Sequence, residues 1–127
     1  MSWPGTPGRS LGRARAASAD DARTLAVSRI AQHCLRVLVE TQDPGAAAAL
    51  AGAAAMDEVL DAAGIGTPGL YHGDGPATWA VISEGLRRGR DVRVGLEDVL
   101  TLPDGSPAGG NAELVATVVA MARRAAR

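Results

Sequence analysis

The sequence predicts an α/β fold, and three observations carry that prediction. Segments rich in β-branched and other apolar residues alternate along the chain with segments whose apolar residues recur at helical spacing. Gly, Pro, Asp or Asn stands at most of the boundaries between them. The 127 residues suffice for one core but fall short of the roughly 200 that a complete (β/α)8 barrel needs. We therefore expect parallel strands joined by helices.

Residues 1–19 are predicted to be a disordered tail, and residues 20–127 the folded domain. The tail holds three arginines, no acidic residue and many Gly, Pro and Ser residues, whereas the remainder holds ten arginines and fourteen acids. An upstream extension without function explains the tail, and a nucleic-acid or targeting role is the alternative. The net charge of -1 argues against a nucleic-acid partner for the whole chain.

The first half of the domain is predicted to contain two helices with a strand between them. A helix from residue 20 or 21 to 32 has one apolar face, and residues 34–40 form the first strand. Asp43 and Pro44 have the cap and first-turn residue types of a second helix, which ends before Gly64.

Two further βα units follow, which makes three consecutive units in all. Residues 70–72 are a short strand, and Pro76 opens a helix that ends before Gly89. Residues 92–97 are the third strand. A loop with the turn 103–105 leads to a last helix, for which Asn111 is the expected N-cap.

Two observations bear on location. Cys34 is the only cysteine and forms no internal disulfide, which suits a reducing cytoplasm. The apolar runs are too short for a signal peptide or a membrane span, so we expect a cytoplasmic protein with no membrane role.

Charged residues lie on one face of the predicted third strand. Alternation puts Arg93 and Glu97 opposite its Val and Leu residues, and residues 34–40 show the same pattern, with Glu40 on the charged face. Such strands suit a barrel wall with a functional interior. Arg93 and Glu97 then share a ligand; the alternative is a pair of solvated charges on an uncovered sheet.

Motifs in the last third of the chain resemble a known family. The segment Arg93-Val94-Gly95-Leu96-Glu97-Asp98, followed by Leu102-Pro103-Asp104-Gly105 and Asn111-Ala112-Glu113-Leu114-Val115, is similar to the C-terminal end of the β-keto acid cleavage enzymes. Residues 35–40 and 71–75 resemble the ends of that family's sixth and seventh strands. The resemblance covers residues 24 to 124 and implies βα units 6 to 8 of a (β/α)8 TIM barrel, an incomplete barrel.

The resemblance implies a zinc-dependent enzyme that converts a β-keto acid and acetyl-CoA into acetoacetate and a new CoA thioester. Glu97 falls on the family's carboxylate zinc ligand, and Arg93 and Asp98 on the pair that assists substrate deprotonation. Strict alternation turns Asp98 away from Glu97, so the strand must end or bulge there if both face the site. The sequence departs from the family pattern in lacking its His-x-His zinc ligands and in having Val99 where many members have asparagine.

Other residues at strand ends could also bind a ligand. His72, with Glu40 and Glu97, forms an alternative Glu/His/Glu metal site if the three side chains converge. Gly73 and Gly75 either present backbone N–H groups to a phosphate of CoA or make a simple strand-to-helix turn.

We therefore expect the C-terminal part of a β-keto acid cleavage enzyme, inactive alone, and whether this chain acts as an enzyme stays open. A separately encoded N-terminal half or another copy of the chain would complete the barrel. The alternative is a non-catalytic remnant or interaction module that self-associates through its open sheet.

Overall fold

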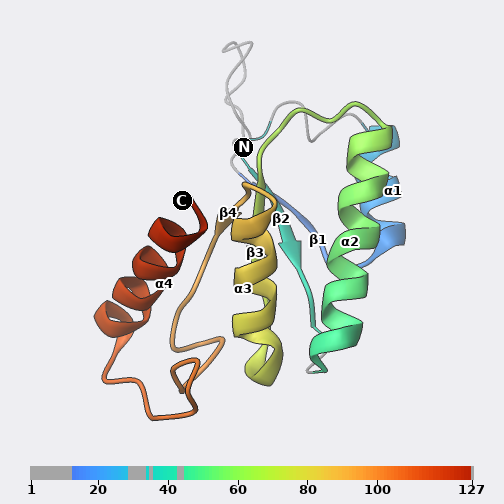
Figure 1. Cartoon of the computed structure of the whole chain (residues 1–127). Coiled ribbons are helices and arrows are strands. Elements are labelled where there is room, and N and C mark those ends of the chain that lie inside the picture. The colour runs from blue at the N-terminus through green and yellow to red at the C-terminus, as the bar shows by residue number, and fades with distance from the viewer. Residues whose placement is uncertain (1–12, 29–33, 35, 43–44, 127) are drawn as a thin grey trace, which may run out of the picture.

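The computed structural model describes residues 13–28, 34, 36–42 and 45–126 and confirms the α/β class (Figure 1). Strands and α-helices alternate in the described residues, and a short 3-10 helix precedes the α-helix that follows β3. The elements are β1 (Arg13–Ala16), α1 (Ala19–Ser28), β2 (Arg36–Glu40), α2 (Ala46–Ala62), β3 (Gly69–His72), the short 3-10 helix η2 (Gly75–Ala77), α3 (Thr78–Arg87), β4 (Asp91–Val92) and α4 (Asn111–Ala125).

The described residues form four βα units, not the predicted three. The additional strand is β1, which lies in the segment predicted to be a disordered tail. It pairs in parallel with β2, and Ala16 is fully buried in the core. Arginine and alanine carry little β-strand signal, so the pairing with β2 rather than the composition of Arg13–Ala16 explains this strand. The disorder prediction is wrong for residues 13–19, and residues 1–12 lie outside the described residues.

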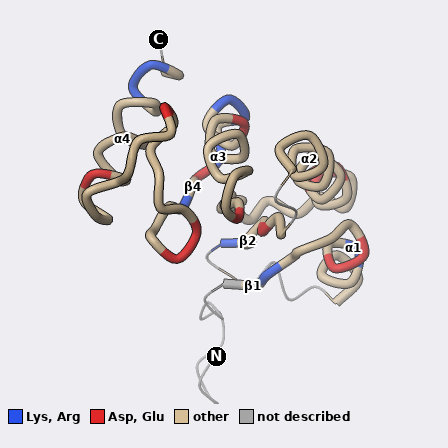
Figure 2. Tube along the Cα trace, turned by 90° about the horizontal axis from the view of Figure 1, so that it is seen from below, with Lys and Arg blue, Asp and Glu red and all other residues tan. Residues whose placement is uncertain are grey.

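The four strands form one parallel sheet in the order β1-β2-β3-β4. The helices follow one another in the same order along one side of it (Figure 2), and each contacts the next. Val37, Val39 and Tyr71 are fully buried on the helix side. They pack with Ala49, Ala53, Met56 and Leu60 of α2, whose spacing defines one helical face. We call the other side of the sheet, to which Leu38 and Glu40 point, the open face.

The predicted C-terminal ends of α2 and α3 agree with the structure. Gly64 and Gly89 follow α2 and α3 with φ angles of +72° each, as expected of glycine at a helix C-terminus. Gly45 is the N-cap of α2, while the predicted cap residues Asp43 and Pro44 lie outside the described residues, as do residues 29–32 of the first predicted helix.

Two predictions near the C-terminus are wrong. The strand predicted for residues 92–97 stops at Val92, and the chain turns at Gly95, whose carbonyl accepts a hydrogen bond from Asp98 N–H at 2.9 Å. Asn111 is not the cap of α4, because Gly110 occupies that position. Its side-chain Oδ1 instead accepts a hydrogen bond from Leu96 N–H at 2.8 Å, which pulls residues 95–98 out of line with the strand.

The last helix is only partly covered. Leu114 is fully buried, but Val115 and Val119 are 50% and 42% exposed. These valines and Val118 line a groove of about 360 Å³ along the free edge of β4. None of the helices in the described ranges is long and apolar enough to cross a membrane.

Candidate active site

Five polar side chains gather beyond the C-terminal ends of the strands, on the open face. Glu40 is the last residue of β2, His72 is the last residue of β3, and Arg93, Glu97 and Asp98 lie in the segment after β4. The register pairs Glu40 directly with His72. Ligands of parallel α/β folds bind at this edge of the sheet. We refer to these five residues as the strand-end cluster.

The turn after β4 brings Arg93 and Glu97 together. Arg93 N–H donates to the carbonyl of Tyr71 at 3.0 Å, so Arg93 still follows the direction of β4. Its Nη2 donates to Glu97 Oε1 at 2.7 Å, and its Nε lies 4.0 Å from Asp98 Oδ2. In an extended strand Arg93 and Glu97 would be about 13 Å apart. The turn was not part of the predicted strand, and it also brings Asp98 to the same side as Arg93 and His72.

Three hydrogen bonds from other elements hold this turn in place. The side chain of Asn111 binds Leu96 N–H, and Gly75 N–H donates to the carbonyl of Asp98 at 2.8 Å. Trp79 Nε1 donates to the carbonyl of Thr101 at 2.8 Å. Sequence reasoning did not assign these roles to Asn111 and Trp79, since each contact joins residues that are 15 or more positions apart.

His72 is buried between two carboxylates. Its side chain is 4% exposed, with Nε2 at 3.9 Å from Glu40 Oε1 and Nδ1 at 3.7 Å from Asp98 Oδ1. Both distances exceed those of a hydrogen bond. Among the described residues neither ring nitrogen has a hydrogen-bond partner. The structure thus brings Glu40 and His72 together as predicted, but the second carboxylate beside the ring belongs to Asp98 and not to Glu97.

The carboxyl group of Asp98 lies in a largely buried position. Burial raises the pKa of its carboxyl group above the ordinary value, and nearby His72 and Arg93 act in the opposite direction. The side chain is 9% exposed, and Oδ2 has no hydrogen-bond partner in the described part of the chain. A carboxylate with a raised pKa is a stronger base, which suits a group that takes a proton from a substrate.

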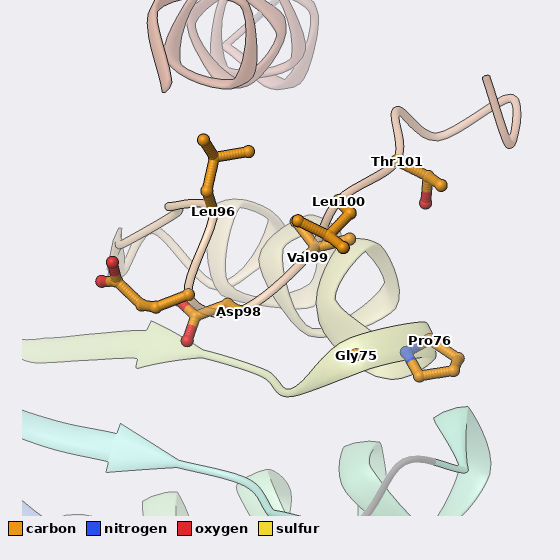
Figure 3. A pocket seen from close by; sticks show the side chains of 8 residues that line it. Gly75, Pro76, Leu96, Asp98, Val99, Leu100 and Thr101 are labelled. Carbon is orange, nitrogen blue, oxygen red and sulfur yellow. The ribbon is translucent and has the colours of Figure 1, made fainter. Parts of the chain in front are cut away.

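A pocket of about 510 Å³ adjoins the cluster. Residues 96–101 line it together with Gly75 and Pro76, and Leu96 and Asp98 point to opposite sides of the loop (Figure 3). Leu100 is 69% exposed, so one wall of the pocket is apolar and accessible.

The two glycines after β3 shape the start of α3. A Cβ on Gly73 would lie 2.9 Å from the Cα of Thr78, so a larger residue would push η2 and α3 away from the strand. Gly75 has a φ of +52°, and its N–H is bound to the Asp98 carbonyl. That N–H is therefore engaged within the protein, and this geometry favours the simple strand-to-helix turn over a phosphate site.

Comparison with known families connects this geometry to a reaction class. The family model described as beta-keto acid cleavage enzyme matches residues 19–127, which include the whole strand-end cluster. The chain belongs to the beta-keto acid cleavage enzyme family. A comparison with curated proteins gave no match.

The zinc ion implied by resemblance to this family does not fit the described residues of the chain alone. A catalytic zinc takes three protein ligands. Within the described ranges, no three His, Cys, Asp or Glu side chains lie close enough to hold a metal ion. Glu97, which matches the family's carboxylate ligand, is bound by Arg93 and is 63% exposed. The alternative site of Glu40, His72 and Glu97 is likewise not formed.

As a member of the beta-keto acid cleavage enzyme family, the chain offers two groups suited to a keto acid. A guanidinium such as that of Arg93 binds carboxylates in a bidentate manner. The Asp98 carboxylate beside it is held in a buried, weakly solvated position. The cluster therefore combines a carboxylate-binding group with a base at one end of the sheet.

Proposed function

We propose that this chain supplies the C-terminal half of a zinc-dependent β-keto acid cleavage enzyme and is inactive alone. The observation that carries the proposal is the convergence of Arg93, Glu97 and Asp98 at the C-terminal ends of the parallel strands. Four consecutive βα units amount to half of an eight-unit barrel. Their open face, and the edges of β1 and β4 that no other described strand pairs with, supply a surface for the other half.

In the proposed reaction the α-carbon of the β-keto acid forms a bond to the acetyl carbon of acetyl-CoA, and the CoA thiol is released. The bond between the α-carbon and the original keto carbon then breaks, and the CoA thiol takes up that acyl group, which yields acetoacetate and a new CoA thioester. In our proposal Arg93 pairs with the carboxylate of the keto acid, and Asp98 accepts the proton that the substrate loses. Glu97 provides one zinc ligand, and a His-x-His pair of the completing half provides the others. We also propose a cytoplasmic location, supported by the single cysteine.

A fusion protein tests this proposal. In it, the first four βα units of a family member that carries the His-x-His pair are joined to residues 13–127 of this chain, and we call this fusion the completed enzyme. We expect acetoacetate and CoA thioester formation, detected by liquid chromatography and mass spectrometry. Asp98→Asn should lower kcat by about 100-fold or more. Arg23→Ala is the control, since Arg23 pairs only with exposed Asp20 on α1. A folded completed enzyme without product formation would contradict the proposal.

The unjoined chain gives a second test. A single carboxylate ligand makes a poor zinc site, so we expect only weak zinc binding by calorimetry. Stoichiometric, submicromolar binding would show that the chain holds zinc without a second half.

A self-associating module without catalytic activity is the second candidate function. The groove along β4 and the exposed valines of α4 favour it, because an apolar groove beside a free strand edge promotes association. Light scattering tests it directly: a second copy would give a dimer or larger assembly, whereas a well-folded monomer would exclude it. An adjacent reading frame that encodes a His-x-His strand end would favour the enzyme instead.

A further inference from the structure

Charged side chains form a continuous row across the C-terminal edge of the sheet. Arg15 of β1 forms an ion pair with Glu40 Oε2, while Glu40 Oε1 faces His72. Asp98 repeats this arrangement, with Oδ1 facing His72 and Oδ2 facing Arg93. Each carboxylate therefore divides its two oxygens between His72 and an arginine, and the imidazole ring is the centre of the row.

The centre of the row is buried but lacks hydrogen bonds. Three of its atoms, His72 Nδ1, His72 Nε2 and Asp98 Oδ2, are buried without a hydrogen-bond partner among the described residues. Buried polar atoms in native proteins nearly always have partners, so such exceptions need an explanation. A movement of about 1 Å would bring each ring nitrogen within hydrogen-bond distance of the carboxylate beside it.

Packing alone does not explain a histidine at this position. Two residues before Glu40 and His72, the open face of β2 and β3 carries another directly paired couple, Leu38 and Leu70, and both are apolar. An apolar residue in place of His72 would remove the two unpaired ring nitrogens from this buried position. The imidazole faces both carboxylates at similar distances, an arrangement suited to fixing the direction of each.

We propose that His72 and Glu40 are positioning residues for Asp98, an inference that rests on the proposed function. Glu40, itself anchored by Arg15, fixes one side of the imidazole ring. The ring then directs Oδ1 of Asp98, which leaves Oδ2 turned toward Arg93 and the substrate. A second carboxylate that orients an imidazole is a common device in catalytic and metal sites.

The first test uses the 127-residue chain and needs no activity. Nuclear magnetic resonance of nitrogen-labelled histidine follows the ring of His72, with His33→Gln identifying the signals of the other histidine. We expect Glu40→Gln and Asp98→Asn each to shift the His72 ring nitrogen signals. Asp91→Asn is the matched control, since Asp91 is a carboxylate that pairs with Arg36 instead. Unchanged His72 signals in both Glu40→Gln and Asp98→Asn would overturn the proposal.

The second test separates positioning from a purely structural role in the completed enzyme. His72→Gln should lower kcat by about 100-fold with KM nearly unchanged, because small displacements of a catalytic group have effects of that size. Glu40→Gln should lower kcat by about 10-fold, and Asp91→Asn should leave it unchanged. Full kcat in folded His72→Gln would overturn the proposal. Absence of turnover in the unsubstituted completed enzyme would instead refute the proposed function, while the histidine signals would still test the contacts of His72.

Discussion

Tyr71 and His72 are neighbours on β3, yet they point to opposite sides of the sheet and lie beside two different groups of charged residues. On the helix side, Asp57 of α2 accepts hydrogen bonds from Arg88 at 3.0 Å and from Arg90 at 2.9 Å, beside Tyr71. On the open face, His72 faces two carboxylates at 3.7 and 3.9 Å without a hydrogen bond. The side chains of His72 and Asp57 are both buried, at 4% and 6% exposed, but of these two only Asp57 is hydrogen-bonded to its charged neighbours.

The difference separates stabilisation from function. A buried carboxylate with two guanidinium donors stabilises the packing of α2 and α3. Its removal would leave Arg88 with Glu84 and Arg90 with the more distant Asp61 as their remaining partners. Buried polar atoms without partners cost free energy, and functional sites are one place where they persist. The Asp57 cluster also has two such atoms, Tyr71 Oη and Arg90 Nε. Its carboxylate is hydrogen-bonded, however, whereas the His72 ring has no hydrogen bond among the described residues. We therefore expect substitutions in the Asp57 cluster to change stability, and substitutions in the strand-end cluster to change activity.

The largest expected effect on stability belongs to Asp57→Ala. The Asp57 side chain is 6% exposed, so its removal leaves Arg88 and Arg90 without their shared partner. We expect the free energy of unfolding to fall by about 3 kcal/mol in urea titrations. Glu58→Ala, at an exposed neighbouring position of α2, is the control. A loss no larger than that of the control would remove the basis for the comparison.

Alkaline pH should weaken the same cluster through Tyr71. Burial, with a further contribution from Asp57, raises the pKa of Tyr71 to about 12. The protonated hydroxyl therefore contributes stability that is present below about pH 10, the unfolded value, and is lost as the pH rises through 12. We expect a decrease on the order of 2 kcal/mol across this range in urea titrations. Tyr71→Phe should lack this decrease, and an equal pH dependence in both proteins would contradict the assignment.

A smaller effect is expected for the bond that holds the turn of the site. Asn111→Ala removes the acceptor of Leu96 N–H and should lower the free energy of unfolding by about 1 kcal/mol. Hydrogen exchange at Leu96 should accelerate because its amide becomes free. Asn111→Asp keeps an acceptor oxygen and serves as the control. Unchanged exchange in Asn111→Ala would mean that the turn does not depend on this bond.

Asp98→Asn should have the smallest effect on stability. Burial disfavours the charge of Asp98, and no hydrogen bond satisfies its Oδ2 in the described structure. Removing that charge should leave the free energy of unfolding at pH 7 unchanged or raise it by less than about 1 kcal/mol. Urea titration beside Asp57→Ala checks this. A loss comparable to that of Asp57→Ala would make the strand-end cluster a structural one.

The elements that the sequence predicted well are those with strong local signals. β2, α2, β3 and α3 have apolar patterns and glycine stops, and their positions agree with the structure to within a few residues. β1 was missed because its pairing with β2, rather than its own residues, makes it a strand. β4 was overextended because the turn at Gly95 is held by the side chain of Asn111, which binds Leu96 from 15 residues further along the chain.

The site could be predicted only in part for the same reason. Alternation and family resemblance singled out Arg93, Glu97 and Asp98. The strand ends at Val92, however, well before the end or bulge that was expected at Asp98. The sequence suggested a metal site that joins His72 and Glu97 because both residues were expected at strand ends. The turn that brings Asp98 to His72 instead is a tertiary feature, since it depends on Gly75, Trp79 and Asn111.

The rate of CoA thioester formation by the completed enzyme with Asp98→Asn tests the central claim most directly. If the strand-end cluster serves activity rather than stability, kcat should fall by about 100-fold or more. The free energy of unfolding should be no lower than that of the unsubstituted protein. Full turnover in the Asp98→Asn enzyme would contradict it.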